Sequence, residues 1–322
     1  MAESPRPDLT VSIINTNNRD LLRQCLTTLF ENTHGISMEV YVVDNVCTDG
    51  SAEMVRADFP EVRLLQNETR LRFCANHNQV LREARGRILL ILNEDTEITP
   101  HALDDLVAFM DEHPDAGVTG VAVLNPDGTL QGSYNEFPTL FSRLVMALGL
   151  NRLGEDAFYP FHPLPADGNA VETDWVGGAC LAVRAEAAEQ AGLMNEAFLI
   201  YDEETDWCYR MKSMGWKVYF VPSVRIVHYQ GKGTNQERPR RRFRINRSAL
   251  LFFKTHYGAL STLGLKLVFV LTSLGRIIVW TPLYGWGRRR ERAALELKYN
   301  WRTILICLTR DDRYDGELFV MS

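Results

Sequence analysis

Short apolar runs alternate with amphipathic segments over residues 1–100. Four runs have the composition and length of strands and end in polar residues: 9–15, 40–43, 62–65 and 88–92. Helical patterns lie between and after them, at 20–32, 53–58 and 76–85. We expect Asp20 to cap the first helix and the fully apolar run at 88–92 to be a central strand. The alternation predicts an α/β fold, with a mostly parallel sheet covered by helices on both faces.

The alternation becomes less regular after about residue 100. Helices are expected at 101–112 and 202–213, and strands at 117–123, 175–183, 218–221 and 224–227. Residues 151–170 are rich in Pro, Gly and Asp, which predicts a loop. We expect an α/β domain over 1–240 and a helical extension over 241–322.

The composition is that of a globular protein, with 46% hydrophobic and 24% charged residues in 322. No apolar run follows Met1, so no signal peptide is expected. The six cysteines lack the spacing of a metal finger, which predicts reduced thiols in the cytoplasm.

The net charge of −6 is unevenly distributed along the chain. Residues 1–224 contain 16 Lys and Arg against 34 Asp and Glu, whereas residues 225–322 contain 19 against 7. A basic tail on an acidic body predicts a second surface with its own partner. An anionic membrane surface fits better than nucleic acid, because apolar segments directly follow the basic ones and no nucleic-acid-reading motif is present.

Three polar clusters follow predicted strands, at 15–18, 44–45 and 93–95. Ligands of open α/β sheets bind at the carboxyl ends of the strands. Mg²⁺ and Mn²⁺, which hold nucleotide diphosphates, prefer carboxylate oxygens. Asp95 is therefore a candidate metal ligand, although an acidic turn that caps the next helix would look the same.

Six segments carry a wider resemblance: VSIINTNNR (11–19), VVDNVCTDGS (42–51), RFCANHN (72–78), ARGRILLILNEDTEI (84–98), DWVGGACLAVR (174–184) and YDEETDWCYRMKSMGWKVYFVPSVRIVHYQGKG (201–233). In order and spacing, over about residues 9–258, they resemble the family-2 inverting glycosyltransferases of the GT-A fold. They are most similar to the bacterial branch that contains rhamnosyltransferases. The resemblance implies metal-assisted transfer of a sugar from a nucleotide diphosphate to a hydroxyl, with inversion.

The resemblance also implies a donor site. Asp44 would accept a hydrogen bond from a pyrimidine, with Asn45 and Asp49 shaping the loop, and Asp95 would bridge Mg²⁺ or Mn²⁺ to the diphosphate. The positions that match donor contacts are Asn15, Thr16, Asn17, Arg19, Asp44, Asn45, Asn76, His77, Asn78 and Asn93.

The chain departs from the family pattern in three places. Asn93 replaces the first acid of the DxD-type motif, and Arg72 and Cys74 stand where glycines are frequent. Arg70 and Arg72 would clamp phosphate, or they are solvated loop charges.

The acid-rich segment 202–206 resembles the family's base motif. Transfer with inversion needs a carboxylate that deprotonates the acceptor. Glu204 matches the base position, with Glu203 and Asp206 as rivals; acids at a helix start also favour its dipole without any catalytic role. Trp207, one turn after Glu203, could desolvate that carboxylate and offer a face to a sugar.

The resemblance assigns further contacts. His228 would complete the metal site or meet the diphosphate, although a lone histidine is more often structural. Lys232, between glycines, suits a loop that closes on the donor phosphates. Trp175, Gly177 and Gly178 resemble the floor on the acceptor side, where glycines allow a sugar close to the backbone.

The basic tail combines six arginines with an apolar stretch at 267–287 that contains Arg276 and Pro282. The arginines are at 238, 240, 241, 242, 244 and 247. A mid-span arginine costs about 2.5–3.5 kcal/mol on insertion scales, so we expect helices that lie on the inner face of the cell membrane or insert shallowly. Arg288, Arg289 and Arg290 would add attraction to anionic lipid. Alternatively, the tail packs on the catalytic domain or on a second subunit as a homodimer.

One other class of donor and two other classes of protein compete with the first interpretation. The resemblance favours L-rhamnose from dTDP-L-rhamnose, with UDP-hexoses as the alternative, and a glycan or lipid-linked glycan as acceptor. The missing acid at Asn93 leaves open a nucleotide-binding scaffold without catalysis. A sugar nucleotidyltransferase would need a glycine-rich loop after the first strand, and the segment 15–20 contains no glycine.

Overall fold

The computed structural model describes residues 6–150, 162, 164–165, 167–229, 238–285 and 289–309. The chain divides into two compact units. The first contains Met1–Phe137, Phe161–Ala197 and Glu203–Gln230, and the second contains Pro138–Pro160, Phe198–Asp202 and Gly231–Ser322. Two segments inside the predicted domain 1–240 thus belong to the same unit as the C-terminal helices. The division cannot be read from sequence order because it depends on contacts between distant segments.

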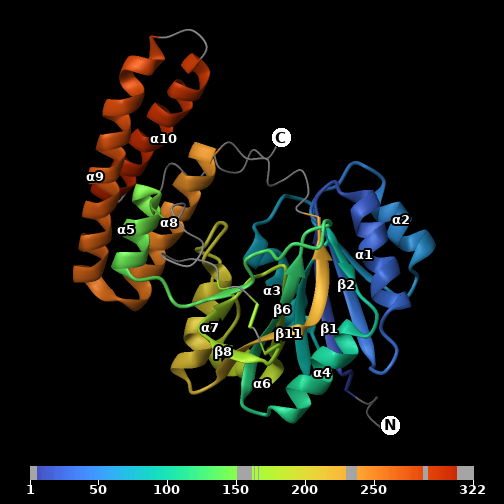
Figure 1. The fold of residues 1–322 in the computed structure, drawn as a ribbon. Coiled ribbons are helices and arrows are strands. Elements are labelled where there is room, and N and C mark those ends of the chain that lie inside the picture. The colour runs from blue at the N-terminus through green and yellow to red at the C-terminus, as the bar shows by residue number, and fades with distance from the viewer. Residues whose placement is uncertain are drawn as a thin grey trace. The chain divides into compact units, whose positions relative to one another are not determined.

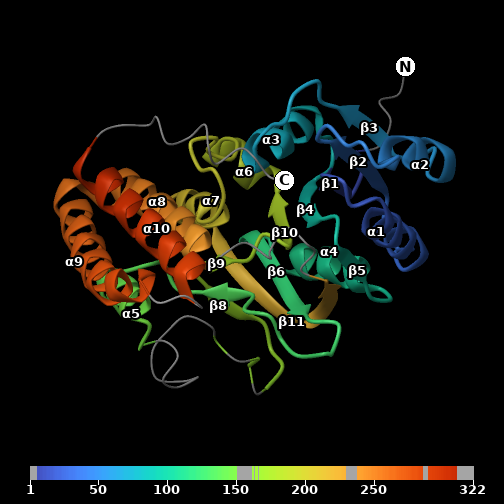
Figure 2. The same cartoon turned by 90° about the horizontal axis from the view of Figure 1, so that it is seen from above.

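The first unit is built on a mixed sheet (Figures 1 and 2). Its strands are ordered β3-β2-β1-β4-β10-β6-β11-β5, and β8 pairs with β11. The bounds are β1 Leu9–Asn15, β2 Met38–Asp44, β3 Arg63–Gln66, β4 Ile88–Asn93, β5 Thr96–Ile98, β6 Ala116–Leu124, β8 Val171–Thr173, β10 Cys180–Arg184 and β11 Lys217–His228. A small ribbon joins β7 Tyr134–Asn135 to β9 Trp175–Val176.

Parallel pairing links β1 to β2 and β4, β2 to β3, and β6 to β11. The β10 strand runs antiparallel between β4 and β6. The run at 88–92 is therefore a central strand, as predicted, flanked by β1 and β10.

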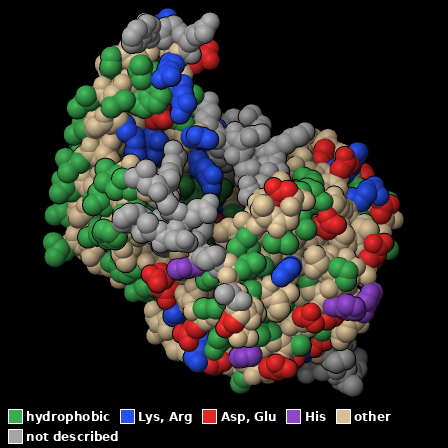
Figure 3. Space-filling view, viewed as in Figure 1, with side chains coloured by type: hydrophobic (Ala, Val, Ile, Leu, Met, Phe, Trp, Pro, Cys, Tyr) green, Lys and Arg blue, Asp and Glu red, His purple; other side chains and the backbone are tan. Residues whose placement is uncertain are grey.

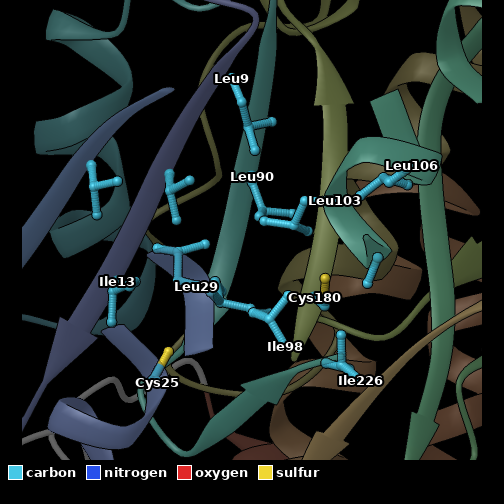
Figure 4. Packing of buried hydrophobic residues seen from close by; sticks show 14 of the residues in the cluster. Leu9, Ile13, Cys25, Leu29, Leu90, Ile98, Leu103, Leu106, Cys180 and Ile226 are labelled. Atoms are coloured by element: carbon cyan, nitrogen blue, oxygen red, sulfur yellow. The ribbon is translucent and has the colours of Figure 1, made fainter. Parts of the chain in front are cut away.

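Helices cover both faces of this sheet, as the α/β pattern predicts. The helices of this unit are α1 Arg19–Glu31, α2 Ser51–Asp58, α3 Phe73–Glu83, α4 Ala102–Glu112, α6 Ala185–Ala191 and α7 Glu203–Ser213. Leu9 and Ile13 of β1 join the core with Leu29 of α1 and Leu103 of α4 (Figure 4). Side chains on the other face of β2, among them Tyr41, pack with Val80 of α3, because successive strand residues point to opposite faces.

Three predicted boundaries are wrong. The first helix begins after Asn18 rather than Asp20, and the Asn18 side chain is bonded to Glu94 instead of capping the helix. The strand predicted at 175–183 is broken after Val176, because β9 pairs with β7 whereas β10 enters the large sheet. The runs at 218–221 and 224–227 form one strand, β11, with a register shift between Val221 and Arg225.

The second unit is helical. It contains α5 Leu140–Leu148, α8 Arg238–His256, α9 Gly258–Tyr284 and α10 Arg290–Leu308. Arg276 of α9 donates to the carbonyl of Ala147 at the end of α5. Among the described helices, α9 alone is long and apolar enough to cross a membrane by length and composition, and little of it is buried.

Candidate active site

The carboxyl ends of four strands lie side by side at one edge of the sheet. Asn15 of β1 is in register with Asp44 of β2, and Asp44 is in register with Gln66 of β3. On the other side, Ile14 is in register with Asn93 of β4. The three polar clusters recognised in the sequence therefore meet in space. Loops at this edge are where open α/β sheets bind ligands.

A network of amides shapes the loop after β2. The side-chain oxygen of Asn45 accepts from the backbone N–H of Leu71 at 2.8 Å and from Asn67 Nδ2 at 3.2 Å. Its Nδ2 donates to the carbonyl of Leu71 at 3.1 Å and reaches Thr16 Oγ1 at 3.4 Å. Asn45 thus fixes the segment that carries Arg70, a role that was predicted only in general terms.

The loop after β1 is fixed by its neighbour after β2. Asn17 has a left-handed φ of 56°, and its side-chain oxygen accepts from the backbone N–H of Thr48 at 2.7 Å. Asp49 accepts from the N–H of Arg19 at 2.8 Å, at the start of α1. Asn17 and Asp49 therefore join the loops after β1 and β2, and the donor contacts that the resemblance implies for Asn17 and Arg19 stay predictions.

Cys47 is a site residue that the sequence analysis missed. Its sulfur accepts from Asn15 Nδ2 and from the N–H of Asn17, both at 3.2 Å, and its own N–H donates to Asp44 at 2.7 Å. Burial, with the nearby charge of Asp44, raises the pKa of the Cys47 thiol to about 12, so it is an inert packing group. Only its position between Asn45 and Asp49 pointed to it.

The direct donor contacts predicted for Asn76, His77 and Asn78 are wrong, because α3 turns all three inward. Asn76 donates to the carbonyl of Leu71 at 3.1 Å and accepts from Asn67. His77 Nδ1 lies 2.8 Å from Ser12 Oγ, and Asn78 is bonded to both backbone groups of Met194. These side chains support the loops around the site.

Asp95 and His228, 133 positions apart, are brought together at the carboxyl ends of β4 and β11. His228 Nε2 lies 3.1 Å from Asp95 Oδ1 and 3.3 Å from Asn93 Nδ2. The side chain of His228 is 13% exposed and that of Asp95 is 11% exposed, so a ligand can reach both.

This pair fits a divalent cation. Neighbouring ligand atoms of an octahedral Mg²⁺, each at about 2.1 Å, lie about 3 Å from one another, which matches the Asp95–His228 spacing. Within the ranges that the structure describes, no three His, Cys, Asp or Glu side chains form a metal cluster. Two protein ligands suffice where phosphate oxygens and water complete the shell, as is usual for Mg²⁺.

Glu94 precedes Asp95 in the chain, and the sequence analysis assigned it no role. It accepts a hydrogen bond from Asn18 Nδ2 at 2.8 Å, which joins the first and third polar clusters. Burial and the charge of Asp95 raise the pKa of Glu94 to about 7. At neutral pH Glu94 is therefore partly protonated, so it adds less negative charge than a free carboxylate would to the edge where a cation would bind.

Glu204 stands at the start of α7, next to a loop of small residues. A Cβ added to Gly178 would lie 4.0 Å from Glu204 Cβ and 4.0 Å from the ring of Phe73. The next residue, Ala179, accepts from the N–H of Asn93 at 3.0 Å. The loop 177–179 therefore connects the surroundings of Glu204 to the end of β4.

The two other candidates for the base differ. Glu203 is buried near Cys74, whose pKa is raised by burial and then by the charges of Glu203 and Glu204. Asp206 is fully buried and forms an ion pair with Arg210 at 2.9 Å. Because Arg210 also donates to the carbonyl of Leu193, Asp206 holds a neighbouring loop, and its prediction as a base is wrong.

Trp207 does not offer a face to a sugar. The ring is completely buried, and its Nε1 donates to the carbonyl of Gly192 at 2.8 Å. The helical period placed Trp207 beside Glu203, but it could not tell which side of α7 faces the core. The prediction that Trp207 contacts the acceptor is wrong for that reason.

The remaining predicted acceptor contacts lie on and after β9. Trp175 is partly exposed and donates from Nε1 to the carbonyl of Glu136 at 2.9 Å. Gly177 donates from its N–H to the carbonyl of Ser133 at 2.9 Å, and Gly178 faces Glu204. Trp175, Gly177 and Gly178 remain predictions for an acceptor floor. Lys232 lies outside the described residues.

Comparison with protein families gives two overlapping matches. Residues 10–164 match "Glycosyl transferase family 2", and residues 88–309 match "Glycosyl transferase family group 2". The second match spans more than half of the chain.

Curated relatives agree with this family. An N-acetylglucosaminyl-diphospho-decaprenol L-rhamnosyltransferase of Mycobacterium tuberculosis is 27% identical over 218 residues, which cover 62% of this chain and 69% of the relative. The low-salt glycan biosynthesis hexosyltransferase Agl10 of Haloferax volcanii is 23% identical over 80% of this chain and 77% of the relative.

Solved structures agree on the fold. The mannosyltransferase PcManGT of Pyrobaculum calidifontis, solved with GDP-Man and Mn²⁺, superposes with a TM-score of 0.56 at 15% identity, covering 96% of this chain and 89% of that one. GalNAc-T7, solved with UDP, GalNAc and Mn²⁺, gives 0.59 at 14% identity, covering 99% and 59%. With the matched families, the GT-A fold and the strand-end site in agreement, the chain belongs to glycosyltransferase family 2 and is a glycosyltransferase that uses a nucleotide-sugar donor.

Proposed function

We propose that this glycosyltransferase transfers L-rhamnose from dTDP-L-rhamnose to a hydroxyl of a lipid-linked glycan, with inversion and with Mg²⁺ or Mn²⁺ bound. The proposal of metal-assisted catalysis depends on one observation, the pairing of Asp95 with His228. The pair lies at the edge of the sheet where β1, β2 and β4 end in Asn15, Asp44 and Asn93. The donor and acceptor follow from the relative named as a rhamnosyltransferase acting on N-acetylglucosaminyl-diphospho-decaprenol. A UDP-hexose is the alternative donor.

Donor binding would use the two loops that follow β1 and β2. Asn17 accepts from Thr48 and Asp49 accepts from Arg19, which joins the two loops. Asp44 presents a carboxylate whose oxygens already accept from Cys47 and Gln66. A pyrimidine presents N–H donors that such a carboxylate accepts. Asp95 and His228 would hold the cation that neutralises the departing diphosphate.

Glu204 would act as the base. In-line displacement needs one carboxylate within hydrogen-bond reach of the acceptor hydroxyl, on the side opposite the leaving diphosphate. The space in front of Gly178 would lie beside Glu204, because a Cβ at this glycine would be at an ordinary contact distance, 4.0 Å, from both Glu204 Cβ and the ring of Phe73. The acceptor hydroxyl would enter that space, lose its proton to Glu204 and attack the anomeric carbon as the sugar–phosphate bond breaks. Glu203, buried one residue earlier, remains the rival.

The second unit would bring the protein to the inner face of the cell membrane, where lipid-linked acceptors reside. Exposed leucines recur along α9 at helical spacing, among them Leu260, Leu263, Leu267 and Leu271 at 58–84% exposure. Phe141 and Leu148 of α5 are also exposed, at 67% and 55%. Figure 3 shows hydrophobic side chains gathered over α9 and α5. Apolar surface of this extent marks a binding face, and a bilayer fits the lipid-linked acceptor.

Not all tail arginines are available for lipid. Arg242 is paired with Glu296 at 2.5 Å, and Arg244 is buried in the helical unit. Arg241 lies over the ring of Tyr201, with 5.8 Å from its Cζ to the ring centroid. Arg242 and Arg244 therefore have contacts within the protein and would contribute little attraction to anionic lipid. Apolar insertion would supply most of the attraction.

The donor is tested by thermal shift with dTDP-L-rhamnose, UDP-glucose and GDP-mannose, each with and without Mn²⁺. A ligand that binds only the folded state raises stability, by about 2.7 kcal/mol at a hundredfold excess over Kd. We expect the largest shift for dTDP-L-rhamnose with Mn²⁺. The anomeric configuration of the product, determined by NMR, should be opposite to that of the donor. Retention would contradict a single displacement, and a shift with a UDP-hexose alone would favour the other donor.

A further inference from the structure

Both ends of the Gln131 side-chain amide contact His228. Its Oε1 lies 2.9 Å from His228 Nδ1, and its Nε2 donates to the carbonyl of His228 at 2.7 Å. Gln131 follows the turn after β6, and its own N–H donates to the carbonyl of Val123 at 2.8 Å. A residue 97 positions away in sequence thus fixes both the backbone and the ring of His228.

A chain of hydrogen bonds determines which way this amide points. Asp127 can only accept, and Thr129 Oγ1 donates to it at 2.6 Å. The hydroxyl of Thr129 therefore accepts from Asn125 Nδ2, at 2.9 Å, which turns Asn125 Oδ1 toward Gln131 Nε2 at 3.0 Å. The backbone carbonyl of His228 is a second acceptor for the same nitrogen. The Gln131 oxygen must then be the atom that faces His228 Nδ1.

This orientation sets the tautomer of His228. A carbonyl oxygen cannot donate, so Nδ1 must carry the hydrogen. A neutral imidazole then has its lone pair on Nε2, the atom that lies 3.1 Å from Asp95 Oδ1. The opposite tautomer would set two acceptors against each other at 2.9 Å, between Nδ1 and Gln131. The Nδ1–H tautomer instead turns the Nε2 lone pair toward the Asp95 carboxylate at 3.1 Å, and a cation bound to both atoms would relieve that repulsion. Two electron-pair donors, Nε2 and the carboxylate, are thereby directed at one point, which suits a cation.

We propose that Gln131 is a positioning residue that holds His228 in the Nδ1–H tautomer and so presents Nε2 with Asp95 to a divalent cation. The inference rests on the proposed metal-assisted transfer for its use, but the tautomer itself is a property of the metal-free protein. Hydrogen-bond partners of a histidine ligand commonly change metal affinity by about 10–100-fold.

The tautomer is tested first, by long-range ¹H–¹⁵N NMR of histidine-labelled, metal-free protein at a pH where imidazole is neutral. Comparison with His228→Ala assigns the signal. The wild type should show a protonated Nδ1 and an unprotonated Nε2. Gln131→Met, similar in length but unable to bond the ring, should shift the signal toward Nε2–H. A wild-type ring protonated at Nε2 would overturn the proposal.

Cation binding is tested by electron paramagnetic resonance titration of Mn²⁺, with and without UDP. Gln131→Met should weaken Mn²⁺ binding by about 10–100-fold. Gln131→Glu keeps an oxygen acceptor for Nδ1–H and should stay closer to the wild type, which a merely structural role for the amide would not predict. Gln190→Met, at a glutamine that accepts from Trp216 at 3.0 Å and is exposed, is the matched control.

The outcomes separate the two proposals. If the wild type binds no Mn²⁺ in any condition, the metal part of the proposed function fails, whatever the tautomer. If His228→Ala abolishes Mn²⁺ binding while Gln131→Met leaves both tautomer and affinity unchanged, the role of Gln131 is refuted and the metal site stands. Should Gln131→Met fail to fold, Gln131→Leu also removes the acceptor for Nδ1–H: a shift of its signal toward Nε2–H supports the proposal, and an unchanged tautomer refutes it.

Discussion

His77 is an ionisable side chain held where it cannot readily be charged. It is fully buried between Ser12 and the ring of Phe73, whose centroid lies 4.5 Å from its own. Burial lowers the pKa of His77 to about 3. The unfolded chain binds a proton below about pH 6.5, whereas the folded protein does so only near pH 3. The free energy of unfolding therefore falls as the pH is lowered through this window.

His77→Gln should flatten this dependence. The group contributes up to about 1.4 kcal/mol per pH unit between pH 6 and 4, so the slope of unfolding free energy against pH should fall by that amount. Urea unfolding at several pH values measures it. His34→Gln, at an exposed histidine, is the matched control. An unchanged slope in His77→Gln would show that His77 is charged in the folded protein.

Glu204 gives the sharpest test of chemistry at a single residue. Glu204→Gln keeps the shape of the side chain but cannot accept the acceptor's proton, so kcat should fall by about 10²–10⁴-fold. The Kd of the donor, measured calorimetrically, should stay nearly constant, because the proposed donor contacts lie in the loops after β1 and β2. Glu203→Gln is the matched comparison. If Glu203→Gln carries the large loss instead, the base is Glu203.

At the scale of elements, the lack of a side chain at Gly120 allows β9 to pack closely against β6. A Cβ at Gly120 would lie 2.4 Å from Val176 Cβ, and Val176 precedes the loop beside Glu204. Gly120→Ala should destabilise the protein by about 1–3 kcal/mol, because the strands would have to separate. Gly177→Ala is the control: its nearest neighbour is 3.8 Å away, so denaturant unfolding should change little. Equal effects would contradict this packing.

The sequence predicted the elements of the first half well, because strand and helix periods alternate there without interruption. It failed at 175–183, where an apolar run looks continuous but the two strands it contains pair with different sheets. Pairing depends on strands far along the chain, such as β4 and β7, and no local pattern reports it. The break matters for the proposed acceptor side, because it produces the loop 177–179.

The candidate site likewise contains residues that could be predicted from the sequence and residues that could not. Asp95 was expected from its place after a buried strand, but His228 joined it only through the family resemblance. Nothing in the sequence pattern indicated that Gln131 belongs to the site, because a glutamine after a turn is usually a solvated surface residue. Trp207 and Asp206 were assigned to the site because helical spacing shows which residues share a face, not which face is buried.

At the scale of the whole molecule, the two units differ in how they treat apolar side chains. The sheet unit buries most of its large hydrophobic residues, with Met214 an exposed exception, whereas α9 buries Leu265 and Phe269 on one side and exposes leucines on the other. Arg276 of α9 is turned to the carbonyl of Ala147. A soluble helix gains nothing from such a stripe, which favours contact with lipid.

This asymmetry leads to a test of membrane association. Leu263→Glu with Leu267→Glu places two charges on the exposed face of α9, where an interfacial helix would bury them. Binding to anionic vesicles in flotation assays should fall by roughly tenfold or more. Raising the salt should weaken the wild type only in part, because apolar burial does not depend on charge screening. Met214→Glu, at an apolar residue 50% exposed after α7, should bind as the wild type does.

Two results would contradict the membrane proposal, and they have different meanings. If the wild type stays out of anionic vesicles at low salt, no lipid contact is made and the acceptor must be met in solution. If the wild type is a dimer that the double substitution converts to a monomer, a second copy covers α9. The spacing of Leu260, Leu267 and Leu274 is seven residues, which suits a helical seam. The exposed residues of α5 argue against that seam, since a bilayer can cover both helices at once, whereas a two-helix seam covers only one stripe.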